Sequence, residues 1–202
     1  MWFVCADLEG VFVPEIWVNV AQKTGIEKLK LTTRDIKNYD ELMKYRLKVL
    51  DENNLKLKDI QDVIATLKPL DGALDFVRWL REVTRLAIVS DTFIEFAQPL
   101  MNKLENPLLL CHSLDIDESG RVANYKLRQP DSKRKTVEAF QSLKYKVLAF
   151  GDSYNDISML KAADVGILFC PPDNVVADYS EFPITRTIPE LKTVIEKYIF
   201  KD

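Results

Sequence analysis

The sequence predicts an α/β fold: a doubly wound, mainly parallel sheet core with a small inserted helical cap. Short apolar runs of strand length recur along the chain, and amphipathic stretches with helical spacing lie between several of them. This alternation is typical of a parallel sheet covered by helices. The insertion is expected because residues 16–68 contain helical patterns and no convincing strand.

The predicted strands are apolar runs, most of them rich in Val, Ile, Leu or Phe: residues 2–6, 86–90, 108–111, 146–150 and 165–169. The predicted helices repeat apolar residues every three or four positions, as in Ala73, Phe76, Val77 and Leu80, or in Val137, Phe140 and Leu143. Residues 112–129 alternate around "IDESGRV" and predict a β-hairpin that turns near Asp117 to Gly120.

The inserted segment carries helical patterns at residues 17–24, 39–52 and 57–67. The chain returns at "KPLDGA" (68–73), which contains the turn residues proline and glycine. An insertion directly after the first strand lies over the carboxyl end of that strand, where ligands bind in open α/β sheets. We therefore expect residues 1–15 and 69–202 to form the core, and residues 16–68 to cover the site as a cap.

Charge and composition exclude several classes of function. The chain has 202 residues and a net charge of −3, which gives no field suited to nucleic acid or an anionic membrane. Its longest apolar runs are far shorter than the roughly 20 residues that span a bilayer. A single histidine and three cysteines without CxxC spacing make a zinc site or a histidine-based triad hard to build. We expect a soluble cytoplasmic protein that acts on a small molecule, with its oligomeric state open.

Four polar features follow predicted strands or open a predicted helix. They are Asp7 and Glu9 in "ADLEG", residues 90–92 ("SDT"), the basic run Lys133 to Lys135, and "GDSYND" (151–156). Since the carboxyl ends of parallel strands meet at one edge of a sheet, the side chains of Asp7, Asp152 and Asp156 should converge. Such carboxylates repel one another unless a hard divalent cation of the Mg²⁺ type joins them, with substrate phosphate among its ligands.

Each feature also has an ordinary structural interpretation. Acidic residues are frequent in turns after strands, Ser90 or Asp91 could cap a helix that begins near Phe93, and the basic run could be a solvated face. The occurrence of all four features in this order favours an active site.

The same four features resemble, in order and across nearly the whole chain, the motifs of the haloacid dehalogenase superfamily. This resemblance implies that Asp7 is a nucleophile that forms an aspartyl-phosphate. It implies that Glu9 is general acid and then base, with its backbone carbonyl on Mg²⁺. Ser90 would bind the phosphoryl group, and Lys133, or alternatively Lys135, would neutralise it. The remaining metal residues would be Asp152, as a ligand, and Asp156, as a more distant or water-mediated partner.

Within the superfamily the chain is similar to phosphoserine phosphatases with a small helical cap, through the segment "RLKVLDENNLKLKDIQDVIATLKPLDGA" (46–73). The similarity implies a small phosphorylated amino acid as substrate, held by Glu15 and Arg46 from the cap and by Asn155. Arg46 lies on a charge-rich helical pattern, so a solvated face or a salt bridge is the alternative for this residue.

Two departures from that pattern are specific. Glutamate stands at position 9 where aspartate is usual, and Asp91 and Thr92 replace a pair of glycines. With "VPEIW" (13–17) and "SDTFIEFAQPL" (90–100), these departures resemble a bacterial subgroup of bifunctional phosphoserine phosphatases and phosphoserine–homoserine phosphotransferases. The resemblance implies hydrolysis of O-phospho-L-serine, homoserine as a second acceptor, and Asp91 and Thr92 as further substrate-binding residues.

Two other functions stay open at this point. A phosphatase of another small phosphometabolite would keep the same scaffold and nucleophile. A phospho-accepting signalling receiver also gathers aspartates, a hydroxyl and a lysine at the edge of a parallel sheet, but residues 16–68 and "GDSYND" favour an enzyme. His112 is expected on the surface or in the hairpin, outside the site.

Overall fold

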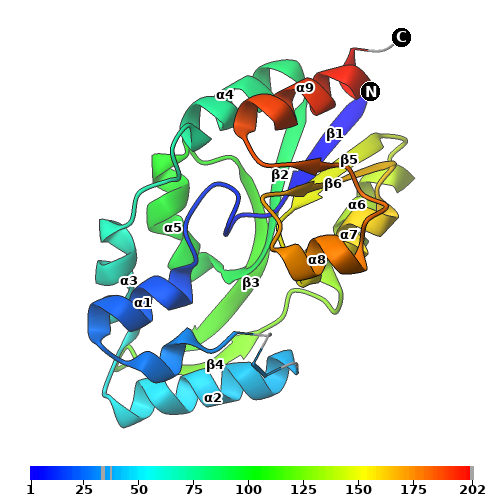
Figure 1. Cartoon of the computed structure of the whole chain (residues 1–202). Coiled ribbons are helices and arrows are strands. Elements are labelled where there is room, and N and C mark those ends of the chain that lie inside the picture. The colour runs from blue at the N-terminus through cyan, green and yellow to red at the C-terminus, as the bar shows by residue number, and fades with distance from the viewer. Residues whose placement is uncertain (33–34, 37, 201–202) are drawn as a thin grey trace.

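The computed structural model describes residues 1–32, 35–36 and 38–200. At its centre is a seven-stranded sheet of order β4-β3-β2-β1-β5-β6-β7 (Figure 1). Its strands are β1 (Trp2–Ala6), β2 (Arg85–Phe93), β3 (Leu108–Ile116), β4 (Val122–Lys126), β5 (Lys146–Gly151), β6 (Val165–Phe169) and β7 (Ile184–Thr185). Neighbouring strands are parallel except β3 and β4, which form the predicted antiparallel hairpin. The predicted fold class is confirmed.

Helices cover both faces of the sheet, with α4 and α9 on one side and α6, α7 and α8 on the other (Figure 1). The helices of this part are α4 (Ala73–Val83), α5 (Ile94–Lys103), α6 (Ser132–Ser142), α7 (Ile157–Ala162), α8 (Asp173–Asp178) and α9 (Ile188–Ile199). Alternate residues of β1 enter two separate apolar clusters, Val4 on one face and Cys5 on the other. This two-sided burial explains why the strand is a continuous apolar run.

Residues 16–68 hold α1 (Ile16–Thr24), the 3₁₀ helix η1 (Glu27–Lys30), α2 (Tyr39–Glu52) and α3 (Leu57–Thr66), at the positions of the helical patterns. These helices lie below the sheet in Figure 1, where α2 packs against β4 and α3 packs against α1 and α5. The Arg121 guanidinium pairs with the Asp51 carboxylate at 2.5 Å, and Lys56 Nζ donates to the carbonyl of Ser119 at 2.8 Å. The contacts fix the inserted helices against the edge of the sheet.

Strand β2 is longer than the sequence predicts. It continues through residues 90–92 to Phe93, which pairs with His112 of β3 after a shift in register. The N-cap residue of α5 is Phe93 and makes no side-chain capping hydrogen bond. The interpretation of Ser90 or Asp91 as a helix cap is therefore wrong.

The helices and the strand after residue 170 were not predicted from the sequence. Strand β7 has two residues, too few to show an alternation. The start of helix α9 was predictable, since a threonine followed shortly by a proline is typical of a helix N-terminus. The Thr187 side chain accepts a hydrogen bond from Glu190 N, and a proline lies in the first turn. Within the part of the chain that the structure describes, no helix has the length and apolarity needed to cross a membrane.

Candidate active site

A tight turn carries Asp7 from the end of β1 into the site. The backbone N–H groups of Phe12 and Val13 both donate to the carbonyl of Leu8, at 2.9 and 3.1 Å. Gly10 has a φ of +75°, and a Cβ there would lie 2.6 Å from Asp152 Oδ2. Only glycine fits this position, because it tolerates positive φ and leaves room for the carboxylate. The turn thereby packs directly against Asp152.

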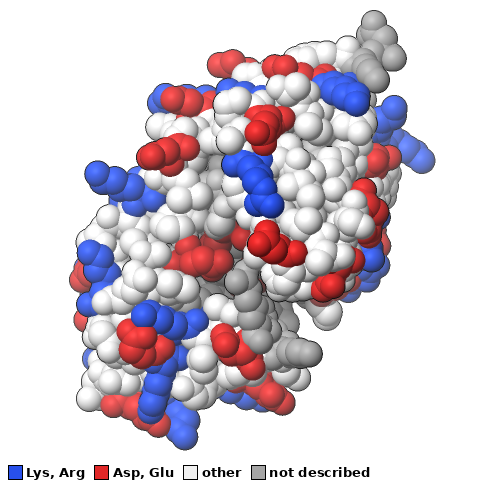
Figure 2. All heavy atoms as spheres, in the orientation of Figure 1, with Lys and Arg blue, Asp and Glu red and all other residues white. Residues whose placement is uncertain are grey.

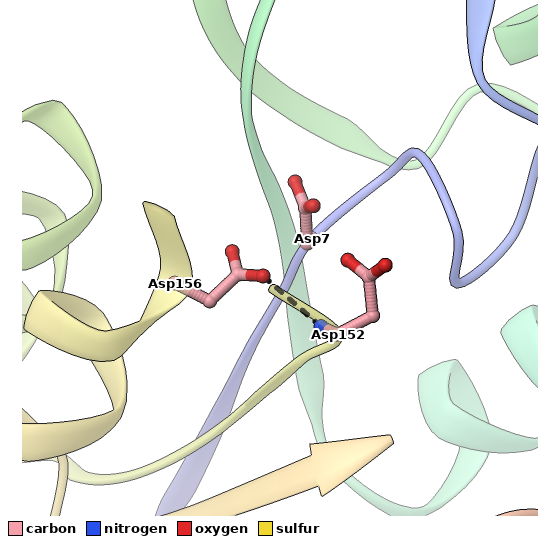
Figure 3. A group of neighbouring side chains, drawn as sticks. All are labelled: Asp7, Asp152 and Asp156. Carbon is pink, nitrogen blue, oxygen red and sulfur yellow. Dashed lines mark hydrogen bonds between the residues drawn. The ribbon is translucent and has the colours of Figure 1, made fainter. Parts of the chain in front are cut away.

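Three aspartates meet at the carboxyl edge of the sheet (Figure 3). Asp7 follows β1, Asp152 follows the adjacent β5, and Asp156 ends the short 3₁₀ helix η2 (Tyr154–Asp156). One ligand oxygen from each lies within 4.8 Å of the others. The structure thus brings together the three carboxylates that the sequence places after strands, as expected where neighbouring parallel strands end.

Asp156 is the anchor of this group. It is fully buried, and its Oδ2 accepts hydrogen bonds from the backbone N–H groups of Asp152 and Ser153, both at 3.0 Å. Its Oδ1 accepts from Lys133 Nζ at 2.7 Å. Because these donors occupy both oxygens, Asp156 holds the loop after β5, and the oxygens of Asp7 and Asp152 are the ones left to bind a cation.

Lys133 supplies the positive charge of the site. Its side chain is buried in the first turn of α6, with Nζ 2.8 Å from Asp7 Oδ1 and 3.8 Å from Asp91 Oδ2. Although burial opposes its charge, Asp156, Asp7 and Asp91 raise the pKa of Lys133 well above its usual value. A solvated face is therefore the wrong interpretation of Lys133. Of the two candidate lysines, the one that contacts Asp7 is Lys133.

The carboxylate cluster is short of positive charge. Burial, and next the Asp156 carboxylate, raise the pKa of Asp7, against the opposing effect of Lys133. Burial, Asp156 and Glu15 raise the pKa of Asp152 to about 7. One ammonium does not offset this many carboxylates, and hard oxygen donors are the ligands that Mg²⁺ prefers. The donor set fits a divalent cation of that type.

Glu9 lies on the same turn, two residues after Asp7. Its Oε2 accepts a hydrogen bond from the backbone N–H of Ile16 at 2.7 Å, at the start of α1. Burial and the nearby Glu15 raise the pKa of Glu9 to about 7, against this hydrogen bond. A carboxyl group with such a pKa exchanges a proton near neutral pH, as a general acid and base must.

A cavity of about 240 Å³ lies beside the aspartates. The candidate residues that line it are Asp7, Glu9, Glu15, Arg46, Ser90, Asp91, Thr92, Asp152 and Asn155. Figure 2 shows acidic side chains in the hollow between the sheet and the inserted helices. The structure thus gathers these candidates around one cavity, with Lys133 and Asp156 buried behind it.

Arg46 reaches this cavity from α2 and is 7% exposed. Its guanidinium carbon lies 4.6 Å from the centre of the Trp17 ring, and Nη2 donates to the carbonyl of Leu31 at 2.8 Å. Among the described residues, its Nε has no hydrogen-bond partner. A solvated face or a salt bridge does not describe this position, because the aromatic ring and a carbonyl hold a buried cation at the cavity wall.

His112 was expected on the surface or in the hairpin, and it lies in the hairpin strand β3 but not on the surface. It is buried, with Nε2 3.6 Å from Asp91 Oδ1. The reason is that β3 continues to Ile116, which keeps His112 inside the sheet. Its position directly after the apolar run 108–111, like that of Ser90 after its own run, indicated a place near a strand end, but not the contact with Asp91.

The family described as haloacid dehalogenase-like hydrolase matches residues 6–164. The chain belongs to the haloacid dehalogenase-like hydrolases. This confirms the superfamily resemblance seen in the four motifs, and it favours an enzyme over a signalling receiver.

Named relatives of this hydrolase are phosphoserine phosphatases. Phosphoserine phosphatase ThrH of Pseudomonas aeruginosa is 60% identical over 192 residues, which cover 95% of this chain and 94% of the relative. A phosphoserine phosphatase of Pseudomonas syringae pv. tomato is 61% identical over 188 residues, 93% of this chain and 79% of the relative. The resemblance to this group within the superfamily is thereby confirmed.

Solved structures share the fold of this hydrolase. A phosphoserine phosphatase in apo form gives a TM-score of 0.78 at 20% identity, over 95% of this chain and 97% of the other. A substrate-bound phosphoserine phosphatase complex gives a TM-score of 0.77 at 19% identity, with the same coverage. At these identities the similarity establishes the fold alone.

Proposed function

We propose that this hydrolase removes the phosphoryl group from O-phospho-L-serine through a phosphorylated Asp7. The observation that carries the proposal is that one cavity is lined both by carboxylates and by a buried guanidinium. Asp7 and Asp152, backed by Lys133, line it from the sheet, and Arg46 lines it from the inserted helices. The names of the two Pseudomonas relatives support phosphoserine as the substrate.

Mg²⁺ fits the carboxylates of Asp7 and Asp152, and by family resemblance the backbone carbonyl of Glu9. When bound, it would neutralise charge on the carboxylates and on the phosphoryl oxygens. The Asp156 carboxylate keeps Asp152 in place, because its Oδ2 accepts a hydrogen bond from the backbone N–H of Asp152. The Lys133 ammonium at 2.8 Å fixes Asp7 and adds positive charge where the transferred group arrives.

In the first half of the reaction, a carboxylate oxygen of Asp7 attacks phosphorus, and the bond from phosphorus to the serine oxygen breaks. The carboxyl group of Glu9 gives its proton to the departing oxygen. In the second half, a water oxygen attacks phosphorus and passes a proton to the Glu9 carboxylate, and the bond from Asp7 to phosphorus breaks. Asp7 and Glu9 thereby return to their starting states.

The substrate's other groups are assigned to the residues around the cavity. Arg46 pairs with the carboxylate, Glu15 with the ammonium group, and Asn155 and Thr92 supply polar contacts. Ser90 is buried, lines the cavity and accepts a hydrogen bond from the N–H of Thr92 at 3.2 Å. Its hydroxyl is assigned to the phosphoryl group. Residues 16–68 act as the cap that closes the site over the bound amino acid.

Replacement of Arg46 by lysine tests the assigned grip on the carboxylate. Lysine keeps the charge and loses the planar pair of donors and the stacking on Trp17. We expect KM for phosphoserine to rise by about tenfold, because a charge-assisted contact is worth roughly 1.5–3 kcal/mol. A phosphomonoester without a carboxylate is the internal control, and its KM should change little. An unchanged KM for phosphoserine would reject the grip.

Removal of metal tests the carboxylate cluster without reference to turnover. We expect Mg²⁺ to raise the Tm of the wild-type protein, since a ligand at about a hundred times its Kd stabilises by about 2.7 kcal/mol. Asp152→Asn should abolish most of this rise, whereas Asp173→Asn, at an exposed aspartate, should keep it. NaCl at matched ionic strength corrects for screening. An equal rise in Asp152→Asn would show that the cation binds elsewhere.

We further propose that homoserine competes with water for the phosphoryl group on Asp7. The longer side chain of Glu9 moves its carboxyl group by about an ångström relative to aspartate, a distance on which acceptor placement depends.

The products formed from phosphoserine, with and without homoserine, test both hydrolysis and transfer. O-Phosphohomoserine should form, and Glu9→Asp should lower its share relative to phosphate. Equal phosphate release in both conditions, without O-phosphohomoserine, would reject the transfer alone. Absence of phosphate release from phosphoserine in the presence of Mg²⁺ would reject the proposed substrate.

A further inference from the structure

Asp91 joins four segments of the molecule at the rim of the cavity. Its Oδ2 accepts from Asn155 Nδ2 at 3.1 Å and lies 3.8 Å from Lys133 Nζ. Its backbone carbonyl accepts from the Tyr39 hydroxyl, at the start of α2, at 2.9 Å. Its Oδ1 faces His112 Nε2 of β3 at 3.6 Å. Whatever fixes this carboxylate therefore also places the Asn155 amide that lines the cavity and a negative charge beside Lys133.

The imidazole of His112 has a defined direction. Nδ1 accepts a hydrogen bond from the backbone N–H of Arg128 at 3.1 Å, so the proton of the neutral ring lies on Nε2, the nitrogen that faces Asp91. The separation of 3.6 Å is that of a close polar contact rather than a short hydrogen bond. The rings of Tyr39 and Phe93, each 6.4 Å away between centroids, pack around the imidazole and hold its plane.

The second contact of His112, with Arg128, connects the imidazole to the helix that carries Lys133. Arg128 Nη2 donates to Ser132 Oγ and to Thr136 Oγ1, both at 2.8 Å. Ser132 directly precedes Lys133 on α6, and Thr136 lies one turn further along. One buried ring thus contacts both the Asp91 carboxylate and the segment that enters α6.

We propose that His112 is a positioning residue of the phosphatase reaction, which acts by holding the Asp91 carboxylate against Lys133 and Asn155. This inference rests on the proposed function. Without the Nε2–H group beside its Oδ1, the Asp91 carboxylate is held through Oδ2 alone, by the Asn155 amide at 3.1 Å and the more distant Lys133 ammonium at 3.8 Å, and it can turn within the rim and shift the Asn155 amide. Displacements of about an ångström at such groups can cost up to a hundredfold in rate.

Two substitutions of His112 separate its two interactions. Asparagine places its amide near the position of Nδ1, so it can keep the Arg128 contact but not reach Asp91. Glutamine places its amide nitrogen near the position of Nε2, so it can keep the Asp91 contact. We expect kcat/KM to fall by about tenfold in His112→Asn and to stay near the wild-type value in His112→Gln. Tm of both variants reports whether the fold is kept.

Asp91→Asn, alone and combined with His112→Asn, completes the test. Because His112 acts through Asp91, the double variant should have no less activity than Asp91→Asn alone. Three results would overturn the proposal. They are reductions in kcat/KM that add up in the double variant, equal reductions in the two His112 variants, or wild-type activity in His112→Asn. The ratio of kcat/KM between each variant and the wild-type protein is measured with any phosphomonoester that the wild-type protein hydrolyses. Failure with phosphoserine alone would therefore reject the proposed substrate and leave this inference testable.

Discussion

Asp7→Asn is expected to abolish turnover while the protein stays folded. The amide cannot attack phosphorus, and loss of an enzyme's nucleophile costs roughly 10⁴-fold or more in kcat. The fold should tolerate the change, because asparagine has the shape of aspartate, and Lys133 keeps its contact with Asp156 at 2.7 Å.

Phosphate release and Tm, measured without and with Mg²⁺, check this result. In metal-free buffer we expect Tm of Asp7→Asn to equal or exceed that of the wild-type protein, since the substitution removes repulsion among buried carboxylates. Asp173→Asn, at a fully exposed aspartate, is the matched control and should leave both quantities unchanged. Retention of a tenth or more of the activity by Asp7→Asn would exclude a covalent role for Asp7.

Lys133→Met is expected to damage both activity and stability. The methionine fills a similar volume but leaves the carboxylates of Asp7 and Asp156 without the ammonium that contacts both, at 2.8 and 2.7 Å. Removal of one partner of a buried ion pair typically costs about 3–5 kcal/mol of unfolding free energy. Weaker stabilisation of the transition state should lower kcat by about a thousandfold, as for a donor of an oxyanion site.

Lys135→Met provides the matched control, two residues further along α6 and partly exposed. Denaturant titration should show a reduced free energy of unfolding for Lys133→Met and an almost unchanged one for Lys135→Met. We expect added Mg²⁺ to recover part of the stability, because a cation partly replaces the missing charge, without recovery of activity. Similar effects in both variants would show that position 133 has no special role.

The core of the site was predictable because each part lies where an apolar run gives way to a polar residue. Asp7 after β1 and Asp152 after β5 are such points, and parallel pairing of adjacent strands brings them together. The buried lysine was harder to predict, since a basic run at a helix start is usually solvated. Its burial depends on the three carboxylates that surround it in the folded chain.

The contacts across the cavity could not be derived from local patterns. Whether Arg46 lies over Trp17 depends on how α1 and α2 pack together, and this is set by tertiary contacts. His112 illustrates the same limit, because its burial depends on the length of β3 and on the packing of Tyr39 against it. Periodicity locates elements along the chain, but it does not fix which side chains of distant elements meet.

Mass spectrometry of the protein, quenched with acid during turnover of phosphoserine and then digested, tests the central claim most directly. We predict one added phosphoryl group on the peptide that contains Asp7, and none on that peptide from Asp7→Asn. Steady phosphate release without phosphorylation of that peptide, or with the phosphoryl group on another residue, would contradict the account.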